Sequence, residues 1–262
     1  MYKKVATGTL KGGTGKTMSL FNISGCLAQT SKVLMVDCDP QCNLTSNTGV
    51  DIADPDQPSV RMIFEEPKVS PETLIWEGVI PDIPSLDLIP SSLYLIDTEM
   101  NLVSKTGRER LLSNWIRRNN EHLKKYDYIM FDTNPSMGLV NQNVFAICDS
   151  IILVTDVGFN SILGAQAFVY LWEKCREGLM LEDNIRAMII NNSDKRTTLL
   201  NDLKEYITSD EDLSKLLVLP DIPSRVAMKR TEGSCLPITF TNDGAAEIIA
   251  ILVENLKRKG AL

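Results

Sequence analysis

Short apolar runs rich in β-branched residues alternate along the chain with segments of helical periodicity. This alternation is typical of strand–helix–strand units, and it predicts an α/β fold with a doubly wound, mostly parallel sheet flanked by helices. Several of the runs are apolar at consecutive positions, as expected for strands that are covered on both faces. The predicted strands span residues 4–8, 32–36, 86–90, 126–131, 150–154, 186–190 and 216–219.

Between and after these strands, apolar residues recur every three or four positions, which is the spacing of a helix that packs one face on a core. Residues 244–258 are a clear example, because Ile248, Ile249 and Leu252 fall on one face. Residues 51–85 are rich in Asp, Pro and Glu and are expected to form loops and short helices. No repeat or linker is evident, so residues 1–262 are expected to form a single domain. The predicted helices span residues 16–29, 106–119, 138–147, 161–178, 196–208 and 244–258.

A glycine-rich segment, Lys-Gly-Gly-Thr-Gly-Lys-Thr at residues 11–17, joins the first predicted strand to the first predicted helix. It follows the phosphate-binding pattern Gly-x4-Gly-Lys-Ser/Thr, except that Leu10 stands in place of the first glycine. In such a loop, backbone N–H groups and the helix N-terminus bind phosphates, the lysine assists, and the final hydroxyl holds Mg²⁺. The candidate nucleotide-binding residues are therefore Lys11, Gly12, Gly13, Thr14, Gly15, Lys16, Thr17 and Met18.

This loop carries one lysine more than the pattern requires. Lys16 is the usual phosphate lysine, and Lys11 is additional. Two ammonium groups on one short loop repel each other unless additional negative charge comes close. We expect that charge to come from a nucleotide, bound either to the same subunit or to a partner subunit.

Carboxylates stand at the ends of two predicted strands. Asp37 and Asp39 flank the end of the second strand on the same side, and Pro40 stops that strand. Ligands of open α/β sheets bind at this edge, and two close carboxylates favour a cation or polarised water between them. Asp132 ends another apolar strand, as is usual for an Asp that holds the water shell of Mg²⁺ beside a triphosphate. A structural alternative for Asp132 is the capping of a following helix.

Composition excludes several other kinds of chemistry. The six cysteines are scattered, and the close pair Cys38 and Cys42 has no further ligand nearby, so free thiols are expected. The single histidine, His122, lies in a polar stretch and offers no acid–base site. No run of eighteen apolar residues predicts a membrane span, and the N-terminus resembles no secretory signal, so a cytoplasmic protein is expected.

Charge is unevenly distributed along the chain. The net charge is −7, but residues 223–262 hold six Lys and Arg against four Asp and Glu, a balance of +2. A basic end on an acidic body is compatible with contact to a phosphate backbone, and equally with ordinary solvated charge at a helix C-terminus. The candidate DNA-contacting residues are Arg225, Lys229, Arg230, Lys257, Arg258 and Lys259.

Three segments together resemble the ParA/Soj family of partition ATPases, in the ParA/MinD superfamily with its deviant Walker A motif. They are residues 11–17, Val-Asp-Cys-Asp-Pro-Gln-Cys-Asn-Leu-Thr at 36–45, and Tyr-Asp-Tyr-Ile-Met-Phe-Asp at 126–132 followed by Pro135 and Ser136. The resemblance covers nearly the whole chain and implies a P-loop NTPase fold, which is Rossmann-like. It also implies a weak Mg²⁺-dependent ATPase that acts as a molecular switch in plasmid or chromosome partitioning.

The resemblance further implies a role for each matching residue. Lys11 is similar to the signature lysine that reaches the other subunit's phosphates in an ATP-sandwich homodimer. Asp39 would orient or activate the attacking water, while Lys16 would hold the β- and γ-phosphates. Mg²⁺ would be held by Thr17 directly and by Asp37 and Asp132 through water. Asn191 or Asn192, together with Pro223, would line the adenine.

The implied partners are non-specific double-stranded DNA, bound by the ATP dimer, and a ParB-like centromere-binding protein that stimulates hydrolysis. The protein would then be nucleoid-associated when ATP is bound, with no membrane contact. The chain begins at its first strand, and in this it resembles the short family members without an N-terminal helix-turn-helix. It departs from the family at Cys42, where glycine is usual, at 133–136, where Cys-Pro-Pro-Ser is usual, and at Ala227, near a usual basic position.

Three alternatives remain open from the sequence. A MinD-like membrane-surface ATPase would need an amphipathic C-terminal helix with aromatic residues, and residues 256–262 contain none. A ParA-like positioner of a protein cargo would share every motif. A small-molecule phosphotransferase or ligase of the dethiobiotin-synthetase type would share the phosphate loop, whereas an iron–sulfur carrier would need a Cys-x-x-Cys pair that the chain lacks.

Overall fold

The computed structural model describes residues 2–51, 54, 57–66, 68–194, 198–225, 228, 231 and 233–262. Within them, six strands form one parallel sheet in the order β3-β2-β4-β1-β5-β6. The strands are β1 (Lys3–Gly8), β2 (Val33–Cys38), β3 (Leu86–Ile89), β4 (Tyr128–Thr133), β5 (Ser150–Thr155) and β6 (Ile185–Ile190). The predicted fold class, a doubly wound parallel sheet flanked by helices, is confirmed.

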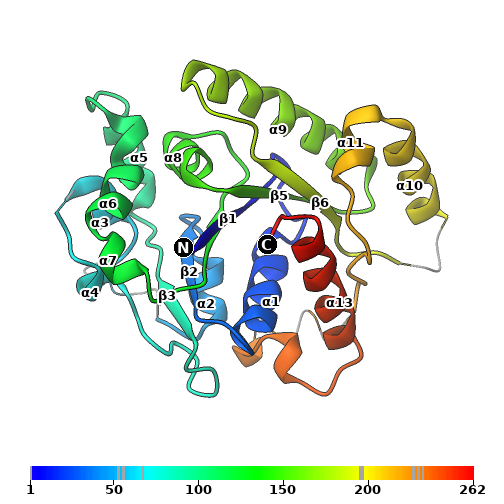
Figure 1. Ribbon diagram of the computed structural model, residues 1–262, viewed down its shortest axis with the longest axis horizontal. Coiled ribbons are helices and arrows are strands. Elements are labelled where there is room, and N and C mark those ends of the chain that lie inside the picture. The colour runs from blue at the N-terminus through cyan, green and yellow to red at the C-terminus, as the bar shows by residue number, and fades with distance from the viewer. Residues whose placement is uncertain are drawn as a thin grey trace.

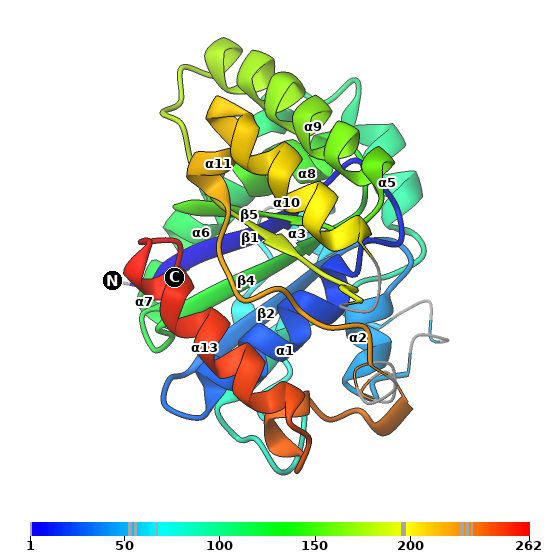
Figure 2. The same cartoon turned by 90° about the vertical axis from the view of Figure 1, so that its right-hand side faces the viewer.

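Helices cover both faces of this sheet (Figures 1 and 2). On one face, α1 (Lys16–Ala28) lies beside α13 (Ala245–Arg258), and Phe21 and Leu252 belong to the core cluster between them and the sheet. The opposite face is covered by α3 (Arg61–Glu65), α5 (Leu95–Leu102), α6 (Leu111–Arg118), α8 (Leu139–Ile147), α9 (Phe159–Gly178) and α10 (Leu199–Ser209). The remaining short helices are α2 (Asn43–Asn47), α4 (Pro71–Leu74), η1 (Arg108–Arg110), α7 (Asn120–Leu123), α11 (Glu211–Leu216) and η2 (Ile238–Phe240).

Burial on both faces explains the consecutive apolar residues of the strands. Every residue of β2 and β5 is buried, including the polar side chains at their ends. In α9, Phe168 and Trp172 pack edge-on against Phe145 of α8, with ring centroids 5.1 and 5.6 Å away. These aromatic contacts, typically worth about 0.5–1.5 kcal/mol each beyond area burial, fix the helices on this face.

Six of the seven predicted strands are confirmed, with ends that differ by at most three residues. The seventh prediction, residues 216–219, is wrong. Leu216 ends α11, and Leu217 makes only an isolated parallel bridge to Met188 of β6. Pro220 follows almost at once and has no N–H to extend a ladder, so this segment meets β6 and the residues after it only in separate bridges, at Leu217 and again at Pro223.

The helix predictions are confirmed in position, with shifted ends. The predicted helix 106–119 begins later, as η1 and then α6, because Gly107 adopts a positive φ of 71°. The predicted helix 196–208 corresponds to α10, although residues 195–197 lie outside the described part of the chain. Residues 51–85 contain only the short α3 and α4 among their described positions, as expected.

The topology gathers the functional segments at one edge of the sheet. Because every strand is parallel, the loops that follow β1, β2, β4, β5 and β6 all lie at the carboxyl edge. The chain passes from β1 to β2 and later places β4 between them, so strand order reverses beside β1. Ligands of open α/β sheets bind at such a point. No helix in the described residues is long and apolar enough to cross a membrane.

Candidate nucleotide-binding site

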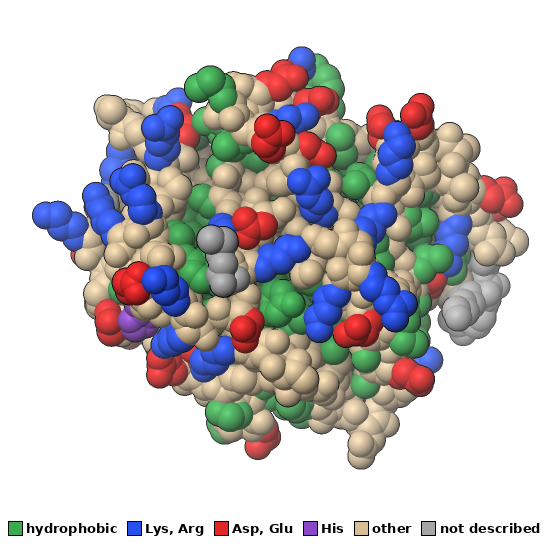
Figure 3. Space-filling model, viewed as in Figure 1, with side chains coloured by type: hydrophobic (Ala, Val, Ile, Leu, Met, Phe, Trp, Pro, Cys, Tyr) green, Lys and Arg blue, Asp and Glu red, His purple; other side chains and the backbone are tan. Residues whose placement is uncertain are grey.

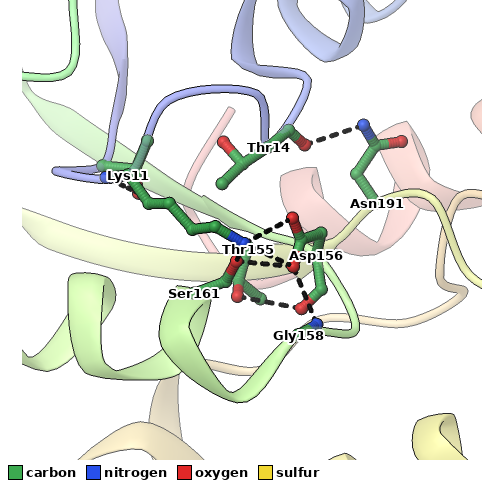
Figure 4. A network of polar contacts seen from close by, with 8 residues as sticks. Lys11, Thr14, Thr155, Asp156, Gly158, Ser161 and Asn191 are labelled. Carbon is green, nitrogen blue, oxygen red and sulfur yellow. Dashed lines mark hydrogen bonds and ion pairs between the residues drawn. The ribbon is translucent and has the colours of Figure 1, made fainter.

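The glycine-rich loop between β1 and α1 depends on glycines for its shape. Gly13 and Gly15 have φ values of 78° and 85°, a region that residues with a Cβ rarely adopt. A Cβ on Gly15 would lie 1.9 Å from the side-chain amide nitrogen of Asn191. That nitrogen donates a hydrogen bond of 2.9 Å to the carbonyl of Thr14 (Figure 4). The loop is therefore fixed from outside by the segment that follows β6.

A cavity of about 620 Å³ opens above this loop. Its size falls in the range of small-molecule sites, and its walls come from five separate segments. The lining residues are Gly12, Gly13, Thr14, Gly15, Lys16, Thr17, Met18, Asp39, Gln41, Asn43, Ser46, Asn47, Pro135, Asn191, Asn192, Arg225 and Met228.

Lys16 is almost completely buried at the floor of the site, with 7% of its surface exposed. Burial lowers the pKa of its ammonium group, and the nearby charges of Asp132 and Asp39 oppose this shift. A buried cation without a full set of anionic partners favours the arrival of an anion. The surroundings of Lys16 therefore suit a bound phosphate.

Asp132, at the end of β4, is fully buried beside the loop. Thr17 Oγ1 donates to its Oδ2 at 2.6 Å, and Thr7 Oγ1 donates to its Oδ1 at 3.3 Å. Burial raises the pKa of Asp132 to about 6, although Lys16 and the two hydroxyls act in the opposite direction. A bound cation would favour the ionised form that burial disfavours.

Asp37 lies in register with Asp132 on the adjacent strand. Its Oδ2 accepts hydrogen bonds from the backbone N–H and hydroxyl of Thr45, at 2.8 and 2.7 Å. Burial, and then the charge of Asp132, raise its pKa to about 7 despite these hydrogen bonds. Thr45, in α2, therefore fixes the orientation of one member of a repelling carboxylate pair.

The donor set at this edge fits Mg²⁺. The groups around Thr17 are hydroxyl and carboxylate oxygens, which are the ligands of hard cations. Across the described residues, no three His, Cys, Asp or Glu side chains form a metal cage. Mg²⁺ commonly binds through one or two protein oxygens, water and substrate phosphates, and it does not require such a cage.

Lys11 opens the same loop but is not among the residues that line the cavity, and its side chain extends toward Asp156 and Ser161 (Figure 4). Its Nζ is 3.0 and 3.3 Å from the two carboxylate oxygens of Asp156, and 2.7 Å from Ser161 Oγ. Asp156 follows β5, and Ser161 lies in the first turn of α9. The additional positive charge thus has an anionic partner within its own subunit, a source that the sequence argument did not consider.

The residues predicted to line an adenine are only partly brought together. Asn191 and Asn192 line the cavity, but the amide nitrogen of Asn191 already bonds to the loop. Pro223 pairs with Ser193 in an isolated bridge and is not among the lining residues.

The described members of the predicted DNA-contacting set lie at opposite ends of α13. Arg225 borders the nucleotide cavity and pairs with Asp243. Residues 257–259 lie at the far end of α13, close to the start of β1, where Lys3 donates to the carbonyl of Gly260. Lys229 and Arg230, like Ala227, lie outside the described residues. On the face seen in Figure 3, basic and acidic side chains are interspersed.

Two site residues received no role from the sequence. Thr45 stood in a recognised motif, yet its bond to Asp37 requires the fold of α2 against β2. Asp156 was detectable, because an apolar strand followed by Asp is the same pattern that marked Asp132. No local pattern indicates that Asp156 pairs with Lys11, which is 145 residues distant.

The fold and this loop define a P-loop nucleotide-binding protein, and comparison with known proteins shows its family. A family model described as an AAA domain matches residues 2–187. The sporulation initiation inhibitor protein Soj of Bacillus subtilis is 31% identical over 212 residues, which cover 79% of this chain and 80% of Soj. The chain belongs to the ParA/MinD family of P-loop ATPases.

An uncharacterised protein of Mycobacterium tuberculosis is 33% identical over 196 residues, which cover 74% of this chain. The match spans only 59% of that relative's length. A plasmid partition protein from Borrelia burgdorferi, solved with AMPPNP, has a TM-score of 0.79 at 22% identity, covering 99% of this chain and 100% of that one. Cobyrinic acid a,c-diamide synthase from Mycobacterium smegmatis, solved with an ATP analogue and magnesium, also scores 0.79 at 22% identity, covering 98% and 95%.

Proposed function

We propose that this protein is a weak Mg²⁺-dependent ATPase that works as a switch in plasmid or chromosome partitioning. ATP binding would join two subunits into a sandwich dimer, and the dimer would bind DNA through its phosphate backbone without reading sequence. A ParB-like partner would stimulate hydrolysis and so release the dimer. The protein would be cytoplasmic, and nucleoid-associated in its ATP-bound form.

The observation that carries this proposal is the divergence of the two lysines of one loop. Lys16 is buried at the floor of the cavity, where one subunit's phosphates would lie. Lys11 lies outside it, with about a third of its side chain exposed. An enzyme that acts as a monomer needs only the first lysine. A second one at the rim suits phosphates that belong to another subunit.

The three carboxylates at the site would have different roles, one toward the attacking water and two toward Mg²⁺. Asp39 lines the cavity and accepts the backbone N–H of Gln41 at 2.9 Å, so it is the candidate to orient the attacking water. Thr17 would hold Mg²⁺ directly, with Asp37 and Asp132 behind its water shell. The ion would neutralise charge on the β- and γ-phosphates. ATP and Mg²⁺ are supported by the ligands of the Borrelia and Mycobacterium smegmatis proteins.

The synthase shares the fold and the ligand, so fold alone does not separate a switch from a biosynthetic enzyme. The position of Lys11 favours the switch.

The decisive experiment measures DNA binding by the Asp39→Ala variant, which should bind ATP without hydrolysing it. Binding to random-sequence duplex would be followed with ATP and Mg²⁺, with ADP and without nucleotide, across a salt series. We expect ATP-dependent binding whose affinity falls steeply with salt. Absence of binding at low salt, with ATP still bound, would reject the DNA role and direct attention to a protein or membrane surface.

Variants of the two lysines test the nucleotide roles separately. Lys16→Ala should abolish ATP binding, and retained tight binding would remove the phosphate assignment. Lys11→Ala should leave ATP binding to the monomer intact while it reduces ATP-dependent dimerisation. Normal dimers would contradict the cross-subunit contact. Asp39→Ala should accumulate ATP-bound dimers, whereas unchanged turnover would exclude its role in hydrolysis.

The two separate basic regions give the DNA surface its own test. We would compare Arg225→Ala with the triple change of Lys257, Arg258 and Lys259 to Ala. Each lost phosphate contact should reduce the salt slope by about 0.9. The region whose removal reduces the slope while dimerisation persists is the contact surface, and an unchanged slope in both would place it elsewhere.

A further inference from the structure

The turn between β5 and α9 contains a preformed site for the ammonium group of Lys11. Asp156 offers both carboxylate oxygens, at 3.0 and 3.3 Å from Nζ, and Ser161 Oγ lies at 2.7 Å (Figure 4). The exposed fractions of the Lys11 and Asp156 side chains are 34% and 18%. Three contacts from two different residues hold this ammonium group, which is more than a surface ion pair usually provides.

This site is organised without help from Lys11. The backbone N–H of Gly158 donates to Asp156 Oδ1 at 2.7 Å, and Ser161 Oγ also bonds to this oxygen. Burial would raise the pKa of Asp156, but the hydrogen bonds from Ser161, Gly158 and Lys11 outweigh it and lower the pKa. The hydrogen bonds from Gly158 and Ser161 therefore keep the carboxylate oriented when the lysine leaves.

The neighbouring backbone also fits around the lysine. Gly164, one turn further along α9, faces Lys11, and a Cβ placed there would lie 3.2 Å from Lys11 Cβ. A Cβ on Gly158 would lie 3.4 Å from Lys11 Nζ and 2.9 Å from Asp156 Oδ1. Small residues at both positions allow the lysine side chain to lie along the start of α9.

This placement creates a competition, if Lys11 acts across the dimer as proposed above. An ammonium group that contacts Asp156 and Ser161 at these distances cannot at the same time contact a phosphate of the other subunit. We infer that Asp156 and Ser161 form an in-subunit dock for Lys11 that opposes ATP-dependent dimerisation and so sets its threshold. This inference rests on the proposed dimeric switch.

A positioning role for Asp156 would predict the opposite effect of its removal on dimer stability. If Asp156 instead held Lys11 in the orientation that the dimer needs, removal of the carboxylate would weaken dimers. The dock predicts stronger dimers, because the subunit no longer has to give up an ion pair. Whether the dimer becomes tighter or weaker therefore decides between a dock and a positioning role for Asp156.

Asp156→Asn is the informative substitution. Asparagine keeps an Oδ1 acceptor for Gly158 and Ser161, so the start of α9 is preserved while the charge that attracts Lys11 is lost. Ser161→Ala removes one contact and leaves the carboxylate. Asp149→Asn is the matched control, because Asp149 pairs with Lys4 and accepts a backbone N–H in the same way, at the amino edge of the sheet.

Dimer dissociation constants would be measured by sedimentation at saturating ATP and Mg²⁺ for these variants in an Asp39→Ala parent. A modest gain of about threefold per subunit, typical of partly exposed ion pairs, gives a dimer about tenfold tighter for Asp156→Asn. Ser161→Ala should tighten the dimer less, and Asp149→Asn should leave it unchanged.

Unchanged or weaker dimers of Asp156→Asn, or an equal effect of Asp149→Asn, would overturn the dock. A parent that stays monomeric with ATP would refute the proposed dimeric switch, and the dock with it. A parent that dimerises normally while Asp156→Asn dimerises no better refutes the dock alone.

Discussion

The close contact between Gly15 and Asn191 makes a quantitative prediction about the phosphate loop. In a Gly15→Ala variant, the new Cβ would lie 1.9 Å from Asn191 Nδ2 and 3.2 Å from its Cγ. The side chain of Asn191 must then move, and its bond to the Thr14 carbonyl is lost. Thr14 and Asn191 are buried, with 1% and 3% of their surfaces exposed, so water would not readily replace the hydrogen bond between them.

The magnitude follows from two separate costs. An alanine at φ 85° and ψ 32° is in the left-handed region, at a cost of roughly 1–2 kcal/mol. A buried carbonyl that loses its partner costs a further 1–3 kcal/mol or so. We therefore expect Gly15→Ala to lower the free energy of unfolding by about 2–5 kcal/mol. Gly13→Ala is the matched control, because Gly13 has a φ of 78° but nothing within 4 Å of an added Cβ.

Urea unfolding of the nucleotide-free protein, followed by tryptophan fluorescence, would measure these changes. A double mutant with Asn191→Ala completes the test, since removal of the amide eliminates the clash while the backbone strain remains. The double variant should be less destabilised than the sum of the two single ones by about 1–3 kcal/mol, because both single changes lose the same hydrogen bond. Equal destabilisation by Gly13→Ala and Gly15→Ala, or simple additivity in the double variant, would refute the reasoning.

Two further predictions concern buried carboxylates. Without nucleotide and Mg²⁺, the pKa values of Asp37, about 7, and Asp132, about 6, lie above the ordinary 3.8. Between pH 3.8 and these raised values the folded state binds more protons than the unfolded state, so the free energy of unfolding should fall by a few kcal/mol as pH rises from about 4 to about 7. Asp37→Asn should flatten this dependence in urea titrations at several pH values, and an unchanged slope would contradict it. Asp87, fully buried, accepts bonds from Lys32 at 2.6 Å, Tyr126 at 2.7 Å and the N–H of Gly78 at 2.9 Å, so Asp87→Ala should cost about 3–5 kcal/mol in the same assay. The exposed Asp82→Ala is its control, and a loss as small as the control's would show that the cluster contributes little.

The strands and the phosphate loop could be predicted because their signals are local. Apolar runs predicted six strands, and residues 11–17 fell between β1 and α1 as expected. Strand order could not be obtained in this way, since the insertion of β4 between β1 and β2 depends on packing across the whole sheet. The same limit explains the wrong strand at 216–219, where one parallel bridge forms but Pro220 prevents a ladder.

The residues of the candidate site show the same difference between local signals and contacts that depend on the whole fold. Asp37 and Asp132 were recognised from strand ends, and the register of β2 with β4 places them side by side. The partners of these acids come from elsewhere. Thr45 reaches Asp37 from a helix that begins after a Cys42 with a positive φ of 55°. Asn191, which the family resemblance offered as an alternative to Asn192 for an adenine contact, lies just beyond β6, lines the cavity and donates its amide N–H to the loop.

Three of the acids at this edge of the sheet have specific side-chain partners within the subunit, and these contacts decide what must change when a nucleotide binds. The carboxylate of Asp132 accepts a hydrogen bond from the Thr17 hydroxyl, and that of Asp37 accepts one from the Thr45 hydroxyl. The carboxylate of Asp156 accepts one from the Lys11 ammonium group. Thr17 Oγ1 donates its proton to Asp132, so its lone pairs remain available to Mg²⁺ and this hydrogen bond can persist. For Lys11 to reach another subunit, by contrast, a whole side chain must move. The first interaction needs no exchange of partners. The second exchanges an ion pair inside a subunit for one between subunits, so the free energy of dimerisation contains only the difference between the two. A switch that must assemble and release at moderate ATP concentration is better served by such a difference than by the full strength of a lysine–phosphate contact.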